Sequence, residues 1–550
     1  MRTWLAGFVI LLTIVLTSRA FFWKGFFPLH DFTLVTRLVE MDRALQDGHF
    51  PVRWSRNLGY GYGMPLFQFY GPTPYYIASG ILFLSQSPIF SIKMLYFVFT
   101  FLGAMGMFVY AKRWFGVVGA TVSSVAFLVF PYRMLDIYVR GAWNEMFAIS
   151  MVPWILHGIE LAYEKSHAKS ILFISFFSFL MFTSHNLMTL MFVPVLVGYA
   201  LVRASRQNLR ALLSIGSGFL LGGGMAMFYL LPSFFEKQYT RVDTLIGGYG
   251  NYKFHFLYLR QLFSGTWGYG GSILGIEDGL SFSLGVIQIA LMCIAGIAYL
   301  RSFRQFSRST HKVVLYAIVV LGASLLLSSF KSSFIWDRVP LMSYFQFPWR
   351  FLSIATLIIP LLIGSLFTSI REAVVRASVA ASCIFALLLS IGNTYLPKER
   401  MENPEALYYT DVKKIQKEMS GILPDYIPIT ISQSEPPVPD TRVSFKREGP
   451  SVDTKVDRTH EMLVQTRLSD PNSLVFSIAI FPGWTFYING EKVEPIITDA
   501  GIYEVPLEAG EWTVSARFES TPLRRIADGI SIVAWFVYIG VTLYADYRKH

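Results

Sequence analysis

The side chains best suited to acid–base chemistry lie between long apolar runs, and an adjacent His–Asp pair is the most informative of them. His30 and Asp31 occur in the segment GFFPLHDFTLVTRLVEMDRALQDGHFPVRW, residues 25–54. A positioned carboxylate can accept a proton from a hydroxyl group, and an imidazole can orient it or share a metal ion. Two interpretations stay open: Asp31 is a catalytic base or metal ligand assisted by His30, or it is the N-cap of a following helix.

A second polar segment, PYRMLDIYVRGAWNEMFAI, carries Glu145 at the start of an apolar run. Arg140 and Asn144 lie just before it. A carboxylate at this depth is costly in a membrane unless it is paired or functional. Glu145 is therefore either a second acid of a site or a helix-start carboxylate favoured by the helix dipole and paired with Arg140.

Two further polar interruptions bring candidate binding groups. MFTSHNLMTL contains His185 and Asn186, which form either a tight polar turn or part of a site. YFQFPWRFL contains Gln346 and Arg350 beside a cluster of aromatic residues. Arg350 is either a snorkelling side chain of an aromatic belt or a clamp for a phosphate group, which suits guanidinium geometry.

The elements that must position these residues are membrane spans. Of the 550 residues, 53% are hydrophobic and 15% are charged, whereas soluble domains carry about 25% charged residues. The apolar runs have the length that crosses a bilayer, roughly 17–25 residues. We expect a polytopic α-helical membrane protein of about 12 spans, at 3–21, 92–111, 116–131, 146–162, 170–184, 187–202, 211–232, 281–300, 313–329, 351–370, 377–395 and 526–545, with an interfacial or half-inserted helix at 74–90.

Basic residues predict the orientation of these spans. They occur at alternate loops, which is the positive-inside pattern for cytoplasmic segments and places both termini in the cytoplasm. The net charge of +11 is spread over these short bursts, so it does not indicate nucleic-acid binding. The basic loop residues are Lys112, Arg113, Lys165, Lys169, Arg203, Arg206, Arg210, Arg301, Arg304, Arg308, Lys312, Arg371, Arg376, Arg548 and Lys549. The other loops, including the first outer loop 22–91, then face outward with the candidate site.

The segment after Asp31 predicts an amphipathic helix. Leu34, Leu38, Met41 and Leu45 recur at helical spacing and form one apolar stripe. Such a helix is suited to the interface plane, with its apolar side toward lipid or the helix bundle.

The apolar runs stop at 396–525, where prolines and short alternating segments predict a small extracytoplasmic antiparallel β-sandwich. Asn489-Gly490 lies between two strand-like runs and predicts a hairpin turn, because both positions need a positive φ. The expected domains are a transmembrane domain 1–395, the β-rich domain 396–525, and a final span with a basic cytoplasmic tail, 526–550.

The polar segments together resemble bacterial 6-pyruvoyl-tetrahydropterin-synthase-related membrane proteins, their YfhO-type relatives and, more broadly, GT-C glycosyltransferases. The resemblance is carried by PLHDFTLVTRL, LGYGYGMPLFQFYGP, RGAWNEMFA, TSHNLM, FQFPWRFL and FPGWTFYINGEKV. It implies an outward-facing site in which Asp31 is the essential acid and Glu145 the second acid. The implied donor is a polyprenyl-phosphate sugar. The candidate cofactor is a divalent cation, Mg or Mn. RGAWNE also resembles the acid-bearing second outer loop of oligosaccharyltransferase catalytic subunits, but Trp143-Asn144 stands where that pattern has Asp-Asn, which puts metal binding through this loop in doubt.

The expected function is a membrane glycosyltransferase of the bacterial inner membrane with Asp31 as base. The expected acceptor is an envelope glycan, lipid or protein, and the other contacts are membrane lipids. The alternatives are a transporter or flippase of lipid-linked glycans and a non-catalytic envelope assembly factor. Because the ionisable groups cluster at the outer ends of the spans, an enzyme is favoured over a transporter with mid-membrane charges. The expected substrate-binding residues are His30, Arg140, Asn144, His185, Asn186, Gln346 and Arg350.

Overall fold

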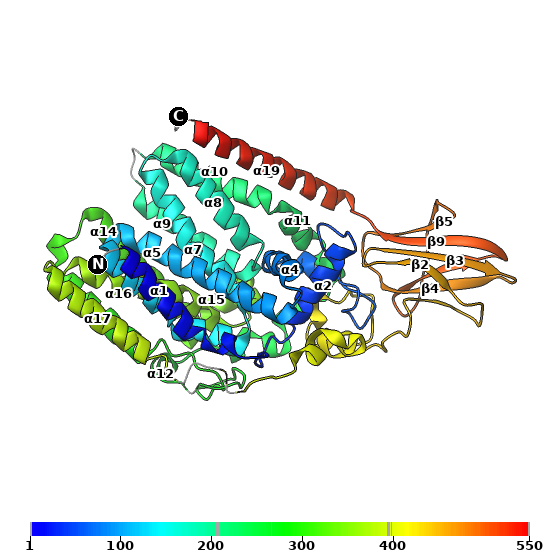
Figure 1. Cartoon of the computed structure of the whole chain (residues 1–550), viewed down its shortest axis with the longest axis horizontal. Helices are drawn as coiled ribbons and strands as arrows, with labels where there is room; N and C mark the ends of the chain where they lie inside the picture. Colours follow the sequence, from blue (N-terminus) through cyan, green and yellow to red (C-terminus); the bar gives the residue numbers. More distant parts are fainter. Residues whose placement is uncertain (1–2, 205–207, 266, 393–396, 398, 548–550) are drawn as a thin grey trace.

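The computed structural model describes residues 3–204, 208–265, 267–392, 397 and 399–547. It consists of an elongated helical body with a small all-β domain at one end (Figure 1). The beginning of the first helix and the end of the last helix lie at the opposite end of the body from the β domain (Figure 1). Both ends of the described chain are therefore on one side, in line with the expected topology.

A helix coincides with each of the 12 expected spans. The spans expected at 92–111 and 116–131 both fall in one helix, Pro88–Leu128. The apolar helices at these positions are α1 (Thr3–Thr17), α5 (Pro88–Leu128), α7 (Trp143–Tyr163), α8 (His167–Phe182), α9 (Asn186–Arg203), α10 (Leu209–Met225), α11 (Met227–Phe235), α13 (Val286–Arg301), α14 (Arg308–Ser328), α16 (Leu352–Ser365), α17 (Ala373–Leu389) and α19 (Pro522–Tyr547). The prediction of a mostly helical membrane protein is confirmed.

Helix α5 is a hairpin of two antiparallel segments. Gly116 has φ 68° and ψ −177°, outside the helical region, and glycine reaches such a conformation without steric cost. The Ser124 hydroxyl donates a buried hydrogen bond to the Ala104 carbonyl at 3.0 Å, which requires the chain to double back. The two spans expected at 92–111 and 116–131 are thus present as separate helical arms.

By length and apolarity, six of the described helices can cross a membrane, and α10 with α11 makes a seventh if this pair, bent by 70°, is one span. Four more helices are apolar but shorter: α1, α8, α13 and α17. These features support a membrane protein but not a fixed number of 12 spans.

Shorter helices make up the segments between the spans. They are α2 (Leu34–Gln46), α3 (Leu66–Phe69), α4 (Thr73–Ser85), α6 (Pro131–Leu135), α12 (Leu259–Phe263), α15 (Ser333–Arg338) and α18 (Val412–Lys414), and a π-helical turn follows at Asp136–Arg140. The helix expected after Asp31 exists as α2, and its apolar stripe is buried. The polar side of its first half is buried too, with Arg37 and Glu40 at most 2% exposed. The second half of α2 reaches the surface at the exposed Gln46.

The β domain consists of two antiparallel sheets, in the strand orders β1-β4-β8-β7 and β2-β3-β9-β5-β6. The strands are β1 (Val443–Phe445), β2 (Asp453–Asp457), β3 (Glu461–Leu468), β4 (Asn472–Ala479), β5 (Trp484–Ile488), β6 (Glu491–Val493), β7 (Ile496–Ile497), β8 (Ile502–Leu507) and β9 (Gly510–Phe518). Phe486 of one sheet contacts Phe476 and Tyr503 of the other, with ring centroids 5.2 and 4.8 Å apart. This packing makes a sandwich and confirms an antiparallel sheet domain near the C-terminus.

The expected hairpin joins β5 to β6. Asn489 has φ 50° and Gly490 φ 90°, and Ile488 pairs with Glu491 across the turn. The Asn-Gly prediction is confirmed at both positions, because a two-residue hairpin of this kind needs both positive angles.

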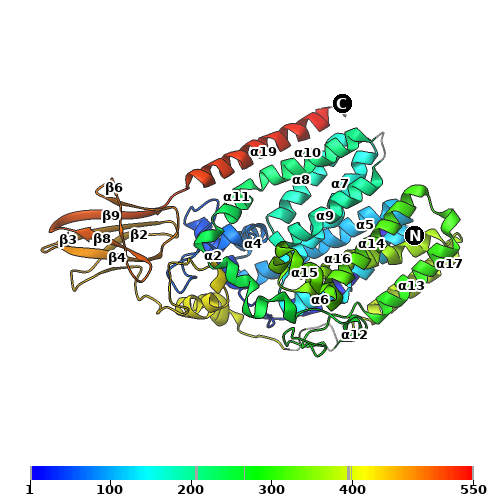
Figure 2. The ribbon, with the colours of Figure 1, turned by 180° about the vertical axis from the view of Figure 1, so that it is seen from behind.

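The β domain packs on the segment 22–91. Trp54 lies against Phe518 and Trp484, with ring centroids 5.3 and 5.7 Å apart, and Arg56 forms a 2.8 Å ion pair with Asp457. Seen from behind, the domain extends from the end of the body that carries α2 and α4 (Figure 2). The segment at 393–396, where the first expected domain ends, and the basic residues Arg206, Arg548 and Lys549 lie outside the described residues.

Candidate functional site

Asp31 is bound by an arginine of the helix that follows it. Arg37 is the fourth residue of α2, and its Nη1 and Nη2 donate to the two Asp31 carboxylate oxygens at 2.8 and 2.9 Å. The guanidinium also lies over the Tyr70 ring, 4.0 Å from its centroid, and donates to the Tyr70 hydroxyl at 2.9 Å. Arg37 is buried, whereas the Asp31 side chain is 24% exposed. The buried guanidinium therefore fixes the Asp31 carboxylate, and one side of this carboxylate stays exposed.

The interpretation of Asp31 as a helix N-cap is wrong. Thr33 is the N-cap residue of α2, and no side chain makes the capping bond there. The Thr33 hydroxyl instead donates to Asp31 at 2.8 Å. Asp31 lies two residues too early to reach the free amides of the first turn, so its carboxylate is available for other contacts.

The main chain of the His–Asp segment is bonded to the segment that carries Arg140. The His30 amide donates to the Val139 carbonyl at 2.8 Å, and the Asp31 amide donates to the Arg140 carbonyl at 2.9 Å. Gly141 has φ 70°, and a Cβ there would come within 3.3 Å of Asp31 atoms. The exposed His30 side chain turns the other way and donates to the Tyr269 carbonyl at 2.9 Å.

Glu145 is the buried centre of a second group of polar side chains at the start of α7. It accepts hydrogen bonds from Ser353 at 2.9 Å, Tyr132 at 3.1 Å and Arg140 at 3.2 Å. The Arg350 Nε lies 3.7 Å from the same carboxylate. The Glu145 side chain is 1% exposed. It lies on the buried side of the group and is close to both guanidinium groups. The expected pairing with Arg140 is confirmed.

The two arginines of this group are also positioned by aromatic rings. Arg140 lies 4.5 Å from the Trp349 ring centroid and is ion-paired with Asp136. Arg350 donates to the Gln346 side chain at 2.8 Å and lies 4.9 Å from the Phe347 ring. Because rings and carboxylates fix both guanidinium groups, they form a preorganised cationic patch.

His185, the N-cap of α9, and Asn144, which precedes Glu145 on α7, lie beside the same group. The His185 Nδ1 accepts the Met188 amide at 3.3 Å and caps α9. Burial lowers the pKa of His185 to about 4, and Arg350 and Arg140 add to this effect, while Glu145 opposes it. Asn144 is buried and donates to the carbonyls of Gly71 and Ser184 at 2.9 and 3.1 Å. Because Nδ1 accepts the Met188 amide, the neutral imidazole carries its proton on Nε2 and can donate a hydrogen bond from that atom.

Asn186 and Gln346 contact backbone carbonyls of other outer segments. Asn186 donates to the Phe69 carbonyl at 3.3 Å, and Gln346 donates to the Leu245 carbonyl at 2.8 Å. Both amides join loops that are distant in the chain, so their observed bonds are structural.

A segment between the last two apolar helices covers the site. Tyr426 packs edge-on against Tyr70, with ring centroids 6.2 Å apart. Burial raises the pKa of the neighbouring Asp425, and this residue accepts a 2.8 Å hydrogen bond from Thr244. These contacts link the segment at 425–426 to Tyr70, next to Asp31, and to Thr244.

The donor atoms around Asp31 do not fit a divalent metal ion. Among the described residues, no three His, Cys, Asp or Glu side chains come close enough to share one. Mg²⁺ and Mn²⁺ prefer several oxygen ligands, but both Asp31 oxygens face the Arg37 guanidinium. The residues present therefore support chemistry in which arginines carry the positive charge.

An apolar cavity of about 40 Å³ lies elsewhere, among α5, α7, α9, α14 and α16. Its lining includes Tyr110, Leu156 and Tyr199. It lies toward the opposite end of α7 from Glu145, and it is too small for a sugar. It is not part of the polar site.

The sequence left three contributors unassigned: Arg37, Tyr70 and Ser353. Arg37 follows Asp31 by six residues. Its position off the apolar stripe was the only sign that it lies on the polar side of this helix. Ser353 lies 208 residues from Glu145 in the chain, so no local pattern connects them. Tyr70 lies in one of the aromatic, glycine-rich segments, which gave no indication of its partner.

The comparison with protein families decides the classification. The model of the 6-pyruvoyl-tetrahydropterin synthase related domain, a membrane protein domain, matches residues 67–395. The chain belongs to this family. The match covers most of the helical body and includes Glu145, His185 and Arg350.

Individual relatives are more distant. An uncharacterized protein of Lactococcus lactis subsp. cremoris (strain MG1363) is 24% identical over 240 residues, which is 41% of this chain and 38% of that protein. The cryo-EM structure of arabinofuranosyltransferase AftD from Mycobacteria superposes with TM-score 0.44 and 14% identity over 73% of this chain and 28% of that one. Its R1389S mutant, class 2, gives TM-score 0.45 and 15% identity over 73% and 29%. The chain thus spans well under half the length of each.

Proposed function

We propose that the protein transfers a sugar from a polyprenyl-phosphate donor to an acceptor hydroxyl group at the outer face of a bacterial inner membrane. The observation that carries this proposal is the direct bonding of the Asp31 segment to the Arg140 segment. It joins the segment of the partly exposed Asp31 carboxylate to the segment of Arg140, one of the two arginines of the cationic patch. Glycosyl transfer from a lipid phosphate needs these two functions, a proton acceptor and a stabiliser of the leaving phosphate.

In the proposed reaction, Asp31 takes the proton of the acceptor hydroxyl as its oxygen forms a bond to the sugar C1. The bond from C1 to the phosphate oxygen breaks, and the lipid phosphate leaves with the electron pair. Arg350 and Arg140 stabilise its charge. The Tyr70 hydroxyl contacts Asp31 at 3.3 Å, the longest of the hydrogen bonds to this carboxylate, and is the partner for an acceptor hydroxyl to replace.

The other residues have supporting roles in this proposal. Glu145 is buried, so we assign it the positioning of Arg140 and Arg350 in place of a substrate contact. His30, His185 and Gln346 lie around the two charged groups and are proposed as substrate contacts. Asn144 and Asn186 hold the surrounding backbone.

The test is Asp31→Asn in membranes supplied with labelled lipid-linked sugar. Turnover should fall by roughly a hundredfold or more, because a general base contributes about 10²–10⁴-fold. Asp42→Asn is the matched control, since Asp42 is bonded to Gln46 on the same helix outside the site. Full turnover in the Asp31 variant would exclude Asp31 as the base, and no turnover in the parent protein would favour a flippase or an assembly factor.

A second test separates donor binding from chemistry. Arg350→Ala should weaken retention of the lipid-linked donor while leaving expression unchanged, because the phosphate loses a guanidinium partner. Arg467→Ala on the exposed face of β3 is the control. Equal donor retention in the two variants would contradict the clamp.

A further inference from the structure

Two outer loops expose large apolar side chains where a water-facing loop would hide them. Leu259 and Phe263 of α12 are 72% and 50% exposed, and Phe334 of α15 is 55% exposed. Exposed contiguous apolar surface on a protein marks an interaction site. We call this surface the interfacial shelf and define it by Leu259, Arg260, Phe263, Phe330, Lys331 and Phe334.

The shelf is bonded to the ends of two apolar helices. The Leu257 amide donates to the Ser328 carbonyl at 2.8 Å at the end of α14, and the Phe330 amide donates to the Leu257 carbonyl at 3.2 Å. The Leu284 amide, just before α13, donates to the Leu262 carbonyl at 2.9 Å. The shelf therefore lies at the level where α13 and α14 leave the hydrocarbon region.

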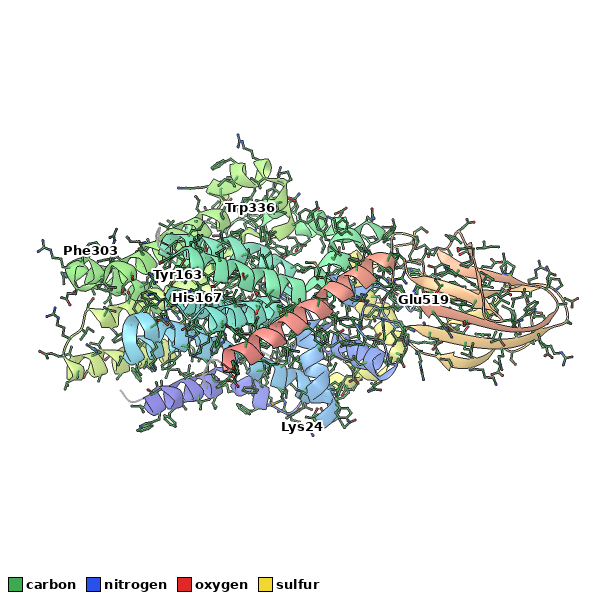
Figure 3. The ribbon with its side chains drawn as sticks, turned by 90° about the horizontal axis from the view of Figure 1, so that it is seen from above. Lys24, Tyr163, His167, Phe303, Trp336 and Glu519 are labelled. Atoms are coloured by element: carbon green, nitrogen blue, oxygen red, sulfur yellow. The ribbon has the colours of Figure 1, made fainter. Side chains whose placement is uncertain are left out.

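A packed aromatic layer holds the shelf in place. Tyr258 stacks on Phe330 with ring centroids 6.2 Å apart, and Phe256 lies 5.6 Å from Trp336, which is buried. The segment around Trp336 projects from the side of the helical body, away from α19 (Figure 3). The fold buries Trp336 but leaves Phe334 outside, so the outward direction of the shelf side chains is fixed by packing.

The charges on the shelf are basic. Arg260 and Lys331 are exposed among the apolar residues, and Arg338 is exposed beside them. Two nearby acids are engaged by protein groups: Asp337 accepts from Tyr252 at 2.7 Å, and Asp278 accepts from the Ile273 amide at 2.7 Å. Apolar side chains interleaved with basic ones match the boundary between acyl chains and anionic headgroups.

We propose that the interfacial shelf binds anionic lipids at the surface of the bilayer. Leu259, Phe263 and Phe334 insert at the level of the upper acyl chains, and Arg260 and Lys331 bind headgroup phosphates. This proposal does not depend on the sugar-transfer activity. It assigns to these outer loops a membrane-bound position, whereas the sequence predicted only that they face outward.

Depth measurements test the insertion. Cys293 and Cys383 are replaced by alanine, a single cysteine is placed at Phe334 or Ile497, and each is labelled with the fluorophore NBD in nanodiscs. Ile497 is the matched control, because it is 64% exposed on the β domain. Spin-labelled lipids should quench the label at 334 at least about twofold more than the label at 497, as expected for a side chain inserted at the interface. Equal quenching at both positions would overturn the proposal.

Lipid selectivity tests the charge. At low salt, spin-labelled phosphatidylglycerol should quench the label at 334 more than spin-labelled phosphatidylcholine at the same mole fraction, and high salt should reduce the difference. Arg260→Gln/Lys331→Gln should remove this preference, while Lys455→Gln/Lys492→Gln on the β domain should keep it. A preference that persists in the shelf variant, or is absent in the parent protein, would refute anionic binding. The lipid preference of the parent protein is measured without any substitution in the shelf charges. This measurement therefore tests the proposal even if the shelf variant does not fold.

Discussion

At the scale of single residues, the environment of Asp31 depends on one guanidinium group. Arg37 binds both carboxylate oxygens and lies on Tyr70. A planar fork satisfies two oxygens at once, whereas a lysine ammonium is a point charge. The orientation of Asp31, and with it the proposed proton transfer, should therefore be sensitive to the geometry of this cation as well as to its charge.

We predict that Arg37→Lys lowers kcat by roughly tenfold to a hundredfold with little change in KM, since small misplacements of a catalytic group cost up to about a hundredfold. The measurement is steady-state turnover of labelled lipid-linked sugar. Arg43→Lys is the control, because Arg43 is on the same helix and pairs with Glu40 away from Asp31. A rise in KM alone would show that Arg37 acts through binding.

At the scale of elements, a buried ion pair joins α11 to the start of α19. The Arg524 Nε and Nη2 donate to Glu236 at 3.0 and 2.8 Å, and both side chains are buried. Thr521 also donates to this carboxylate at 3.1 Å. The pair fixes the point at which the chain leaves the β domain, near Glu519, and returns to the helical body (Figure 3).

We predict that Glu236→Gln destabilises the protein by roughly 3–5 kcal/mol, because it leaves the buried Arg524 without a counter-ion. Thermal or denaturant unfolding in detergent measures this change. Asp440→Ala should have almost no effect, since its pair with Lys413 is exposed. Glu236→Leu/Arg524→Met should recover most of the loss, because replacing both charges removes the desolvation cost. A double variant as unstable as the single one would show that packing is the cause.

At the scale of the whole molecule, a pair of histidines joins the β domain to the segment 22–91. His49 stacks on His460 with ring centroids 5.2 Å apart, and Asp47 accepts the Thr459 amide and hydroxyl, both at 2.6 Å. Burial lowers the pKa of His49 to about 3, and His460, Arg53 and Arg524 lower it further. The docked state therefore favours a neutral imidazole.

We predict that docking weakens as the pH falls. An unfolded histidine takes up its proton near pH 6.5, about its ordinary pKa, whereas docked His49 does so only near pH 3. Its contribution is complete above the unfolded pKa and is lost as the pH falls from about 6.5 toward 3, at roughly 1.4 kcal/mol per pH unit. Hydrogen exchange at residues 44–62 at pH 7.5 and 5.5 measures this loss.

His49→Phe is the control for this prediction. A phenyl ring can keep the contacts with Phe518 and His460 but carries no titratable group. Its pH dependence should be flatter than that of the parent protein. Parallel pH curves for the two proteins would assign the effect to other groups.

Most of the local structure was predictable from the sequence. Apolar runs of bilayer length gave the helices, because backbone groups in lipid must be satisfied within the helix. The short alternating segments predicted β3, β4, β5, β8 and β9, and Asn489-Gly490 predicted the hairpin turn. These features depend on neighbours a few residues apart, so the chain alone specifies them. The membrane class and the family resemblance follow from the same kind of information.

Only the tertiary structure decided how the polar segments meet. The bond between Ser353 and Glu145 and the contact of Trp54 with Phe518 join residues far apart in the chain. The burial of Arg37 depends on Tyr70, which comes from another part of the same outer loop. The sequence does not show whether a charged side chain faces water or a partner. Its free energy in the folded protein depends on the surrounding atoms, which only the tertiary structure supplies. For this reason the sequence indicated candidate acids and arginines, and the fold determined which of them are paired, buried or exposed.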